Sequence, residues 1–253
     1  MASHSGGLSD QTVVRIRSLT RRFGERVILG GVDLDIARGE FVALLGRSGS
    51  GKSTFLRALA GLDHDIDGSG EIAVPEKLSV VFQDARLLPW KRVLDNVLFG
   101  LSGPDREERA RHALDEVELT ARIDAWPVQL SGGEQQRAAL ARSLVRTPEL
   151  ILADEPFGAL DALTRIRMQD LLRRLAARHR PAILLVTHDV EEAIHMADRV
   201  LVLDQGRFTV DLLIDLPTTT PHRERAIAEI RQRLLSELGV APHQAREEVL
   251  HGQ

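Results

Sequence analysis

The chain has 253 residues, of which 43% are hydrophobic and 28% are charged, enough for one large core or for one core with a smaller attached subdomain. A net charge of -4 argues against a strongly basic nucleic-acid-binding domain. The lack of cysteine excludes disulfides and thiolate metal sites. Residues 1–10 carry no apolar signal segment, and no apolar run approaches the roughly 20 residues that a membrane-spanning helix needs. Any membrane role is therefore expected to come through a partner.

Two segments near the N-terminus, residues 12–19 and 27–36, partly alternate apolar and polar side chains, which predicts antiparallel or edge strands. Five short apolar runs follow, and most of them lead into helical patterns. They occupy residues 41–45, 78–82, 149–153, 182–186 and 199–203. Continuous apolar strands that alternate with helices predict an α/β fold with a mostly parallel sheet covered on both faces.

Residues from about 91 to 145 have a mostly helical pattern, with breaks at "SGPD" and "WPVQLSGG". We expect a helical subdomain over about residues 84–145, inserted into a core domain of residues 11–216. Residues 1–10 are expected to form a flexible N-terminus, and residues 217–253 a short helical extension.

The extension contains a charged helix with one apolar face. This face is formed by Ile227, Ile230, Leu234 and Leu238. We expect the face to pack on its own chain, and a dimer contact is the alternative.

The segment "GRSGSGKS" fits the phosphate-loop pattern G-x-x-x-x-G-K-[ST] at every fixed position, after an apolar strand and at the start of a helix. Its glycines let backbone N–H groups approach an anion, and the helix N-terminus adds its dipole. We expect Lys52 to reach the β- and γ-phosphates of a nucleotide and the Ser53 hydroxyl to ligate Mg²⁺. A glycine-rich turn with one exposed lysine is the alternative. The predicted nucleotide-binding residues of this loop are Gly46, Arg47, Ser48, Gly49, Ser50, Gly51, Lys52, Ser53 and Thr54.

Two acids, Asp154 and Glu155, stand at the end of an apolar strand in "LILADEP". One carboxylate can hold Mg²⁺, usually through water, and the second can orient and deprotonate an attacking water. Alone, the pair would be interpreted as turn residues. The phosphate loop upstream favours the catalytic interpretation.

His188 ends the next strand in "LLVTHDV". One interpretation makes it the neighbour of a helix cap, because Asp189 and Glu192 have the spacing of a capping box. The carboxyl ends of parallel strands, however, open into one crevice, where ligands bind. We therefore expect Gly46, Asp154 and His188 to face the same nucleotide.

The segment "LSGGEQQR" starts another helix. Ser131 and Glu134 have the spacing of a capping box, which explains these two residues but not the two glycines between them. Gly132 and Gly133 lower the helix propensity, by up to about 1 kcal/mol each in a helix interior, and suggest N–H groups kept open for an anion. Two phosphate turns in one chain predict a head-to-tail pair of chains that shares two nucleotides.

With these segments in this order, the chain resembles the ATP-binding subunits of ABC transporters over nearly all of its first 215 residues. The resemblance is carried by "GRSGSGKST" as Walker A, "FQD" as the Q-loop, "LSGGEQQR" as the signature, "LILADEP" as Walker B, "GALD" as the D-loop and "THD" as the H-loop. It implies an ABC-type P-loop NTPase core over residues 11–216, with an antiparallel β subdomain at its N-terminus, that binds ATP and Mg²⁺.

The resemblance also implies roles for single residues. Glu155 would be the catalytic carboxylate and His188 the sensor of the γ-phosphate. Gln83 would be a ligand of the Mg²⁺ and attacking-water region, together with Ser53 and Asp154.

Further roles follow from the remaining motifs. The signature residues, Ser131 to Glu134, would bind the nucleotide of the other chain, and Asp161 would couple the two sites across the dimer. Phe23 stands where the family usually has an adenine-stacking tyrosine, and phenylalanine keeps the stacking face. Ala153 is smaller than the aliphatic residue usual before the Walker B aspartate, which predicts looser local packing.

The loop after the Q-loop glutamine carries apolar surface in Leu87, Leu88 and Trp90. In the family, this segment forms part of a groove that receives a coupling helix from the membrane permease, and such a groove needs an apolar lining. The alternative is that these side chains pack into the helical subdomain. We expect both to hold in part, with partner contact for at least one of the three.

Within the family, "FQDARLLPWKRVLDNV" and "GALDALTRIRMQDLL" resemble the importers for nitrate, taurine and aliphatic sulfonates, and are most similar to the sulfonate importers. The resemblance implies an ATPase that powers sulfonate import as a homodimer at the cytoplasmic face of a bacterial inner membrane. Its partners would be permease subunits and, indirectly, a solute-binding protein, but no nucleic acid. A taurine or nitrate importer is the nearest alternative. A non-transport ABC ATPase of repair or translation and a small-molecule P-loop kinase are the others.

Overall fold

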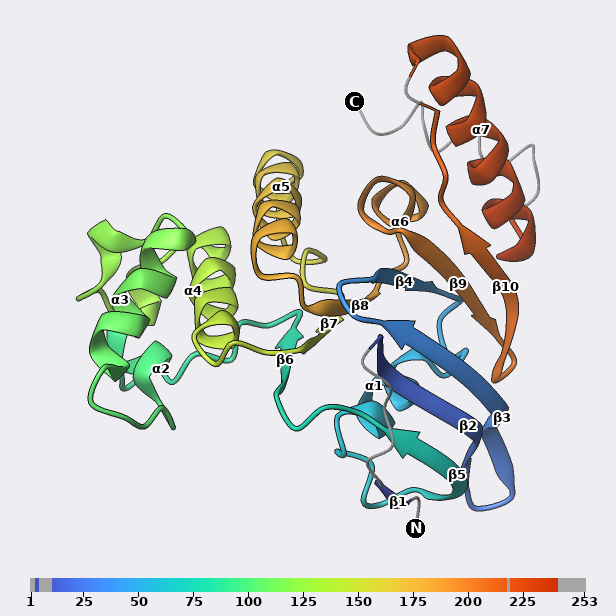
Figure 1. The fold of residues 1–253 in the computed structure, drawn as a ribbon, viewed down its shortest axis with the longest axis horizontal. Helices are drawn as coiled ribbons and strands as arrows, with labels where there is room; N and C mark the ends of the chain where they lie inside the picture. Colours follow the sequence, from blue (N-terminus) through green and yellow to red (C-terminus); the bar gives the residue numbers. More distant parts are fainter. Residues whose placement is uncertain (1–2, 5–10, 218, 241–253) are drawn as a thin grey trace.

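The computed structural model describes residues 3–4, 11–217 and 219–240, which form two sheets and the helices around them (Figure 1). The expected flexible N-terminus, residues 1–10, lies outside the described residues except for residues 3 and 4. Residues 218 and 241–253 of the predicted extension lie outside them as well.

The larger sheet has six strands. They are β4 (Phe41–Leu45), β6 (Leu78–Phe82), β7 (Leu150–Asp154), β8 (Ala182–Val186), β9 (Arg199–Asp204) and β10 (Arg207–Leu213). They lie in the order β10-β9-β4-β8-β7-β6, and all pair in parallel except β10, which is antiparallel to β9. The five apolar runs of the sequence form the five parallel strands, which confirms the predicted α/β class. The strand β10 escapes prediction because only Val210 of this edge strand is buried.

The smaller sheet is formed by strands from the N-terminal part of the chain. Its strands are β1 (Ser3–His4), β2 (Thr12–Phe23), β3 (Arg26–Ala37) and β5 (Asp67–Ala73), in the order β1-β5-β2-β3. The pairing of β2 with β3 and with β5 is antiparallel, as the alternating segments predict. The sequence does not predict β5, in which only Ile72 is buried. Gly70 of this strand has φ +104°, and a Cβ there would lie 2.7 Å from Leu19 Cα, so the close approach of β2 requires glycine.

The α-helices cover the larger sheet and form a lobe beside it. In the described ranges they are α1 (Lys52–Leu59), α2 (Val93–Leu98), α3 (Arg106–Glu116), α4 (Gly132–Leu144), α5 (Ala162–His179), α6 (Val190–Met196) and α7 (Thr220–Glu237). The helix α1 shares a core with both sheets, and α5 and α6 pack on the other face of the larger sheet. The helices α2, α3 and α4 form the lobe, next to β6 (Figure 1). None of these helices is long and apolar enough to cross a membrane.

The lobe lies inside the range 84–145 predicted for an inserted helical subdomain, although the domain boundaries themselves stay a prediction. Its core is continuous with the core under α5 and α6. The lobe is therefore joined to the larger sheet by side-chain packing and by chain connections on both sides.

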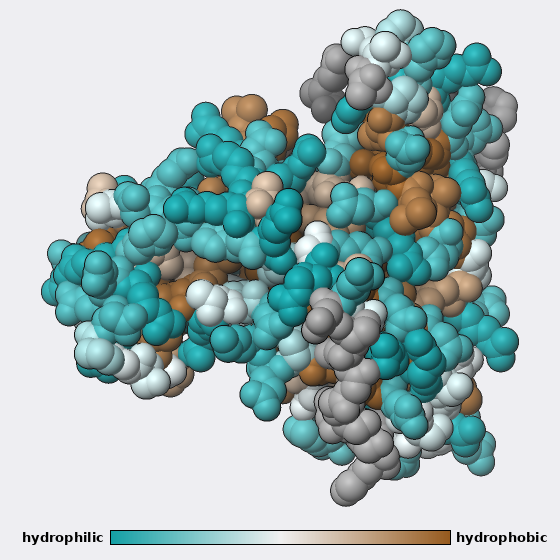
Figure 2. Space-filling view, in the orientation of Figure 1, coloured by the Kyte–Doolittle hydropathy of each residue, from teal (hydrophilic) through white to brown (hydrophobic). Residues whose placement is uncertain are grey.

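The helix α7 packs on its own chain. Leu234 is fully buried, and Ile227, Ile230 and Leu238 are packed against the main core, the cluster shared by α5, α6 and the lobe. This packing confirms the expectation for the apolar face. Apolar surface remains where α7 meets the upper part of β10 (Figure 2), a strand whose Leu213 is 70% exposed. The extension thus belongs to the body of the molecule over residues 219–240.

Candidate nucleotide site

The segments at the carboxyl ends of β4, β7 and β8 lie side by side, because these strands are neighbours and run parallel. Gly46 follows β4, Asp154 ends β7, and His188 comes two residues after β8. The backbone N–H of Glu155 donates to Val186 O of β8 at 2.9 Å. The structure therefore brings together the three segments that the sequence assigned to one nucleotide.

Close backbone contacts fix the shape of the phosphate loop, residues 46–53. A Cβ on Gly46 would lie 2.4 Å from Leu203 O and 2.6 Å from Ser50 Oγ, so only glycine fits there. Gly51, with φ +108°, caps α1, and a Cβ on it would lie 3.1 Å from Ile28 O. The Ser50 hydroxyl is buried without a hydrogen-bond partner in the described part of the chain. A buried hydroxyl of this kind calls for a ligand, and a phosphate oxygen fits it.

Lys52 is the first residue of α1, and its side chain turns back into the phosphate loop. Its Nζ donates to Gly46 O at 2.6 Å and to Arg47 O at 3.1 Å. Burial lowers the pKa of Lys52, and the nearby carboxylates of Glu155 and Asp154 oppose that shift. The loop therefore holds a partly desolvated cation, for which a bound phosphate would be a strong partner.

A cleft of about 410 Å³ opens beside the phosphate loop. It is lined by Arg26, Val27, Ile28, Arg47, Ser48, Gly49, Ser50, Asp204, Gln205 and Gly206. Phe23, the predicted adenine-stacking residue, is 52% exposed and pairs with Arg26 at the end of the β2–β3 hairpin. It thus stands next to the cleft without being one of its lining residues. Arg26 and Val27 of this lining are not predicted from the sequence, in which their only signal is an apolar residue beside a hairpin turn.

The acid pair lies at the end of β7, close to several cations. Burial raises the pKa of Asp154 and Glu155 raises it further, while Arg57, Lys52 and Arg86 lower it. Glu155 has φ +46°, in the left-handed region that residues other than glycine seldom adopt and that is often found at functional sites. A half-buried carboxylate with a raised pKa gains from a bound cation, which would stabilise its ionised form.

The predicted Mg²⁺ ligands fit the donor set of a nucleotide site. Within the described ranges, no group of three or more His, Cys, Asp or Glu side chains is arranged to hold a metal by itself. Mg²⁺ in such sites takes one or two carboxylates and completes its shell with water and substrate phosphates. Phe82 and Asp154 are partners in the register of β6 and β7, so Gln83 follows beside Asp154, and Ser53 is exposed on the first turn of α1.

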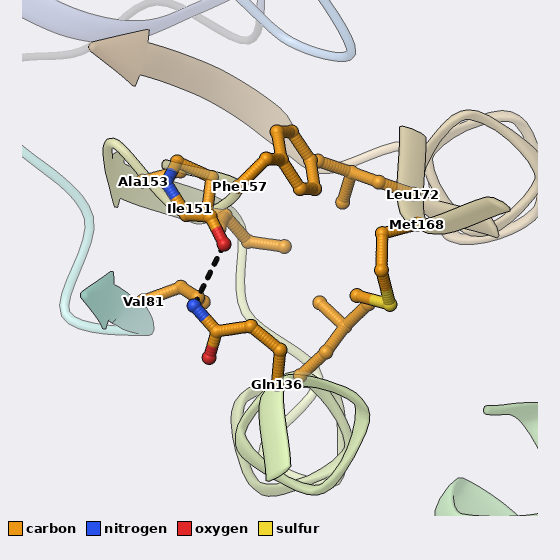
Figure 3. A pocket seen from close by; sticks show the side chains of 9 residues that line it. Val81, Gln136, Ile151, Ala153, Phe157, Met168 and Leu172 are labelled. Carbon is orange, nitrogen blue, oxygen red and sulfur yellow. Dashed lines mark hydrogen bonds between the residues drawn. The ribbon is translucent and has the colours of Figure 1, made fainter. Parts of the chain in front are cut away.

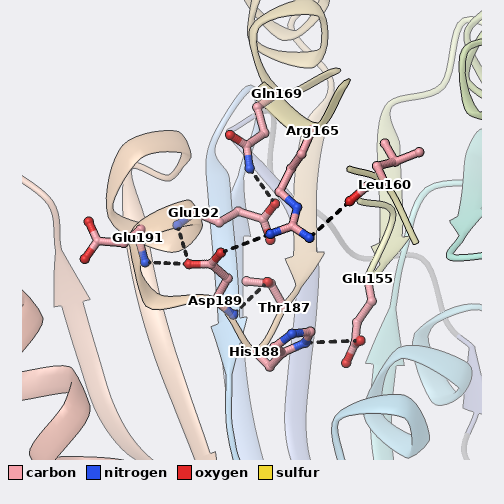
Figure 4. A network of polar contacts seen from close by, with 9 residues as sticks. All are labelled: Glu155, Leu160, Arg165, Gln169, Thr187, His188, Asp189, Glu191 and Glu192. Carbon is pink, nitrogen blue, oxygen red and sulfur yellow. Dashed lines mark hydrogen bonds and ion pairs between the residues drawn. The ribbon is translucent and has the colours of Figure 1, made fainter. Parts of the chain in front are cut away.

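His188 belongs to a polar network at the start of α6 (Figure 4). Its Nδ1 lies 3.2 Å from Glu155 Oε2, and 68% of its side chain is exposed. Asp189 caps α6 by accepting from the N–H groups of Glu191 and Glu192, at 2.9 and 3.1 Å. The network thus brings the predicted catalytic carboxylate and the predicted γ-phosphate sensor into contact.

The capping box suggested at this helix start is wrong in its second half. The side chain of Glu192 is buried and accepts from Gln169 Nε2 of α5 at 3.0 Å. Burial raises the pKa of Glu192, and hydrogen bonds with Thr187 and Gln169 oppose that shift. Arg165, also on α5, lies 3.9 Å from Asp189. Gln169 of α5 therefore takes the place of the Asp189 backbone as a partner of the Glu192 side chain. Together with Arg165, it holds the histidine loop, residues 187–189, from the side of α5.

The signature turn, residues 131–134, begins α4. Ser131 Oγ accepts from the Glu134 N–H at 3.3 Å, and Glu134 Oε2 accepts from the Ser131 N–H at 2.8 Å, which confirms the predicted capping box. The hydrogen bond with the Ser131 backbone lowers the pKa of Glu134, so this carboxylate stays ionised as a cap.

The two glycines of the signature turn differ. A Cβ on Gly133 would lie 2.5 Å from Thr164 Cγ2 of α5, so packing inside the chain accounts for this glycine. A Cβ on Gly132 would lie 3.8 Å from Leu160 Cδ2, an ordinary contact. Packing thus gives a second reason for glycine at Gly133 but not at Gly132, and the expectation that both N–H groups are kept open for an anion stays a prediction.

Asp161 caps α5 next to this turn. Its Oδ1 accepts from the Thr164 N–H at 3.0 Å, and hydrogen bonding to Thr164 lowers the pKa of Asp161. The segment before α5 thus lies against the signature turn within one chain. Its role in coupling two sites across a dimer stays a prediction.

Comparison with known proteins gives the chain a family. The ABC transporter family model matches residues 29–158. An aliphatic sulfonates import ATP-binding protein of Mesorhizobium japonicum is 68% identical over 240 residues, which cover 95% of this chain and 97% of the relative. A protein of the same description from Streptomyces avermitilis is 62% identical over 248 residues, 98% of this chain and 99% of the relative. A solved dimeric ATP-binding cassette in a post-hydrolysis state, bound to ADP and Pi, is 32% identical with a TM-score of 0.70, and covers 80% of this chain and 99% of its own.

The chain belongs to the ABC transporter family. It has the fold of the ATP-binding cassette and is an ABC-type ATPase, as the six motifs and their order predict. The roles assigned to single site residues stay predictions.

One buried residue of this ABC ATPase ties the signature helix, α4, to the segments after β6 and β7, and no pattern in the sequence indicates it. Gln136 of α4 is 3% exposed, and its Nε2 donates to Phe82 O, Gln83 O and Pro156 O at 2.8, 2.9 and 2.7 Å. Figure 3 shows it reaching from α4 toward β6 and β7. A cavity of about 10 Å³ lies beside it and is also lined by Ala153, which agrees with the looser packing expected there.

The loop after Gln83 is held by a buried asparagine. Asn96 is fully buried, and its side chain accepts from the Leu88 N–H at 2.7 Å and donates to Leu88 O at 3.2 Å. Leu87 is partly buried and packs against the main core, whereas Trp90 is 70% exposed. The loop of this ABC ATPase thus turns Leu87 inward and leaves Trp90 uncovered, and contact with a permease stays a prediction.

Proposed function

We propose that the chain is the ATP-hydrolysing subunit that powers the import of aliphatic sulfonates by an ABC transporter. The observation that carries this proposal is the near full-length similarity to aliphatic sulfonates import ATP-binding proteins, at 68% identity over 95% of the chain. The phosphate loop, the acid pair and the histidine at one edge of the larger sheet support the reaction. Import of taurine or nitrate by the same mechanism is the alternative.

Phosphoryl transfer depends on positioning and charge neutralisation more than on covalent chemistry. The phosphate loop binds the β- and γ-phosphates of ATP, with Lys52 as its cation. Glu155 takes a proton from a water whose oxygen forms a bond to the γ-phosphorus, while the bond from that phosphorus to the ADP oxygen breaks. His188, 3.2 Å from Glu155, is placed to donate to the γ-phosphate and to orient the carboxylate.

Mg²⁺ is the proposed cofactor of this reaction. Ser53, Gln83 and Asp154 would hold it together with the phosphates of ATP. When bound, it would neutralise charge on the β- and γ-phosphate oxygens. The raised pKa of Asp154, which burial causes, supports a cation at this position.

The second half of each site is proposed to come from another copy of the chain. The signature turn belongs to the helical lobe, whereas the phosphate loop joins β4 to α1, in another part of the molecule (Figure 1). Two solved dimeric cassettes are among the structures similar to this chain. In a head-to-tail homodimer, residues 131–134 of each chain would contact the nucleotide of the other, and Asp161 would couple the two sites.

A membrane permease is the proposed partner of the loop after Gln83. Trp90 is uncovered and Leu88 is half-buried, so both remain partly available to an apolar face of a partner helix. The subunit would then lie at the cytoplasmic face of a bacterial inner membrane, and a solute-binding protein would act on it through the permease.

Growth on single nutrient sources tests the proposed function. A strain that lacks this gene should fail on ethanesulfonate as sulfur source and grow on sulfate, and the intact gene should restore growth. A defect confined to taurine or nitrate would keep the mechanism and correct the solute. Normal growth on all of these, together with no sulfonate uptake by the reconstituted transporter, would contradict the proposal.

A further inference from the structure

The helix α7, to which the proposed mechanism gives no role, contacts two loops of the candidate site. In its middle, Arg231 forms a bidentate ion pair with Glu191 of α6, in which Nη2 donates to Oε2 at 2.8 Å and Nε donates to Oε1. Two residues after its end, Gly239 lies against Arg47 of the phosphate loop, since a Cβ on Gly239 would lie 3.4 Å from Arg47 Nη1. One helix thus bridges the segment after His188 and the phosphate loop.

The first contact acts on the histidine loop. Glu191 lies in the first turn of α6, and its N–H donates at 2.9 Å to Asp189, the residue after His188 (Figure 4). On the opposite side, Arg165 of α5 lies 3.9 Å from Asp189. The histidine loop is therefore held between α5, through Arg165, and α7, through Arg231.

The second contact acts on the phosphate loop. After α7, the Gly239 N–H donates to Ser236 O at 3.0 Å, with φ +75° at Gly239. The C-terminal end of a helix carries partial negative charge, which attracts a guanidinium group. The carbonyl of Arg47, in turn, accepts from Lys52 Nζ at 3.1 Å. The residue Gly239, after the end of α7, thus lies against Arg47, whose carbonyl helps to hold Lys52.

We propose that α7 is a strut that fixes the placement of the histidine loop relative to the phosphate loop, with Arg231 and Glu191 as positioning residues for ATP hydrolysis. The inference rests on the proposed function. It differs from a plain stabilising role, because the two side chains are 41% and 46% exposed and such pairs contribute only about 0–1 kcal/mol to folding. The buried Leu234 anchors α7 independently of the ion pair.

Substitution of Arg231 by methionine tests the first contact, because methionine keeps an unbranched stem and loses the charge. Arg231→Met should lower kcat by about threefold or more with little change in the KM for ATP, because groups in direct contact are coupled and the histidine loop loses one of its two supports. Arg231→Lys should recover part of the loss. Glu191→Gln should give the same defect, and the double variant should be no worse than either single one.

The matched control is Arg225→Met on the same helix, which removes an exposed ion pair with Glu229 at 2.9 Å. It should keep the wild-type kcat and KM. Thermal unfolding of all variants should agree within about 2–4 °C, the shift that about 1 kcal/mol produces in a chain of this length.

Two truncations test the second contact. A chain that ends at Val240 keeps Gly239 and should match the full chain. A chain that ends at Glu237 keeps α7 but loses Gly239, the residue that lies against Arg47, and its KM for ATP should rise about two- to fivefold. In an Arg47→Met background the two truncations should be equal.

The outcomes separate the inference from the function on which it rests. Wild-type kcat in Arg231→Met, or a loss of activity in Arg225→Met of the same size, would overturn the strut and leave the ATPase assignment intact. A full-length wild-type chain that hydrolyses no ATP would overturn the proposed function instead.

Discussion

The phosphate loop and the signature turn are both glycine-rich and both begin a helix, yet they are completed in different ways. The phosphate loop has its cation, Lys52, folded into it, and two carboxylates, Asp154 and Glu155, close enough to act on that cation. The signature turn has a satisfied cap and a glycine, Gly132, at which a Cβ would meet only an ordinary contact among the described residues.

This difference indicates that contacts within one chain shape the phosphate loop, whereas Gly132 of the signature turn remains open. Backbone contacts require glycine at Gly46, where a Cβ would lie 2.4 Å from Leu203 O. A Cβ on Gly133 would instead lie 2.5 Å from a side-chain methyl, Thr164 Cγ2. In the proposed head-to-tail dimer, a ligand held by the other chain would approach Gly132.

The largest effect is expected at the phosphate half. Glu155→Gln should lower ATP turnover by about 10²–10⁴-fold, because it removes a general base and keeps the shape of the side chain. Nucleotide binding should persist, so the variant should accumulate as an ATP-bound dimer. Steady-state phosphate release and size-exclusion chromatography check both, with the exposed Glu229→Gln as control. Turnover within tenfold of the wild type would remove Glu155 from this role.

A smaller but more selective effect is expected at the other half. Gly132→Asp places a negative charge where the phosphate of the other chain would bind, and like charges brought together cost several kcal/mol, so turnover should fall by at least about tenfold. The same aspartate in a first helical turn should stabilise α4 by about 0.3–1 kcal/mol, so urea unfolding should show no loss.

Gly132→Ala is the matched control, since the Cβ makes only an ordinary contact 3.8 Å from Leu160. It should keep most of the activity. Full activity in Gly132→Asp would mean that no anion approaches the signature turn.

Loss of Gln136 should weaken the link between α4, which carries the signature turn, and the segments after β6 and β7. Gln136→Leu leaves three buried carbonyls without their donor, which should lower the free energy of unfolding by about 1–3 kcal/mol. The neighbouring Gln135→Leu is the control, because the partners of Gln135 Nε2 in the described residues, Pro127 O and Leu130 O, both lie inside the lobe. Urea unfolding and ATPase assays should show a loss of both stability and activity for Gln136→Leu alone. Equal losses in both variants would contradict the role of Gln136 in linking α4 to the segments after β6 and β7.

The smallest effect is expected from the charge of Asp154. Burial raises its pKa, so its ionised form destabilises the fold, and the stability that the neutral form provides is lost as the pH rises through the raised pKa. Asp154→Asn imitates the neutral form. The variant should match the wild type at acid pH and gain about 2–4 °C in Tm near neutral pH, for about 1 kcal/mol. A Tm difference independent of pH would contradict this account.

Sequence patterns predict the parallel strands well because each of them is a short and mostly apolar run bounded by polar or glycine-containing segments. They fail for β5 and β10, in which a single side chain is buried, Ile72 and Val210. Strands of this kind are formed by pairing with neighbours that the local sequence does not reveal.

The residues of the candidate site also differ in how well the local sequence predicts them. The phosphate loop and the Ser131 cap depend on neighbours in sequence, so the pattern predicts them. The partners of Glu192 and Gln136 come from other helices or from strand ends. The local capping pattern therefore misassigned the first and did not mark the second.

A mixture of two inactive variants tests the shared site most directly. In a dimer of one Glu155→Gln chain and one Gly132→Asp chain, one site carries both defects. The other pairs an intact Glu155 with an intact Gly132 from the opposite chain. If the sites are shared head to tail, ATP hydrolysis by the mixture should clearly exceed the sum of the rates of the two variants measured apart. A rate equal to that sum would contradict the claim that each site is completed by a second chain.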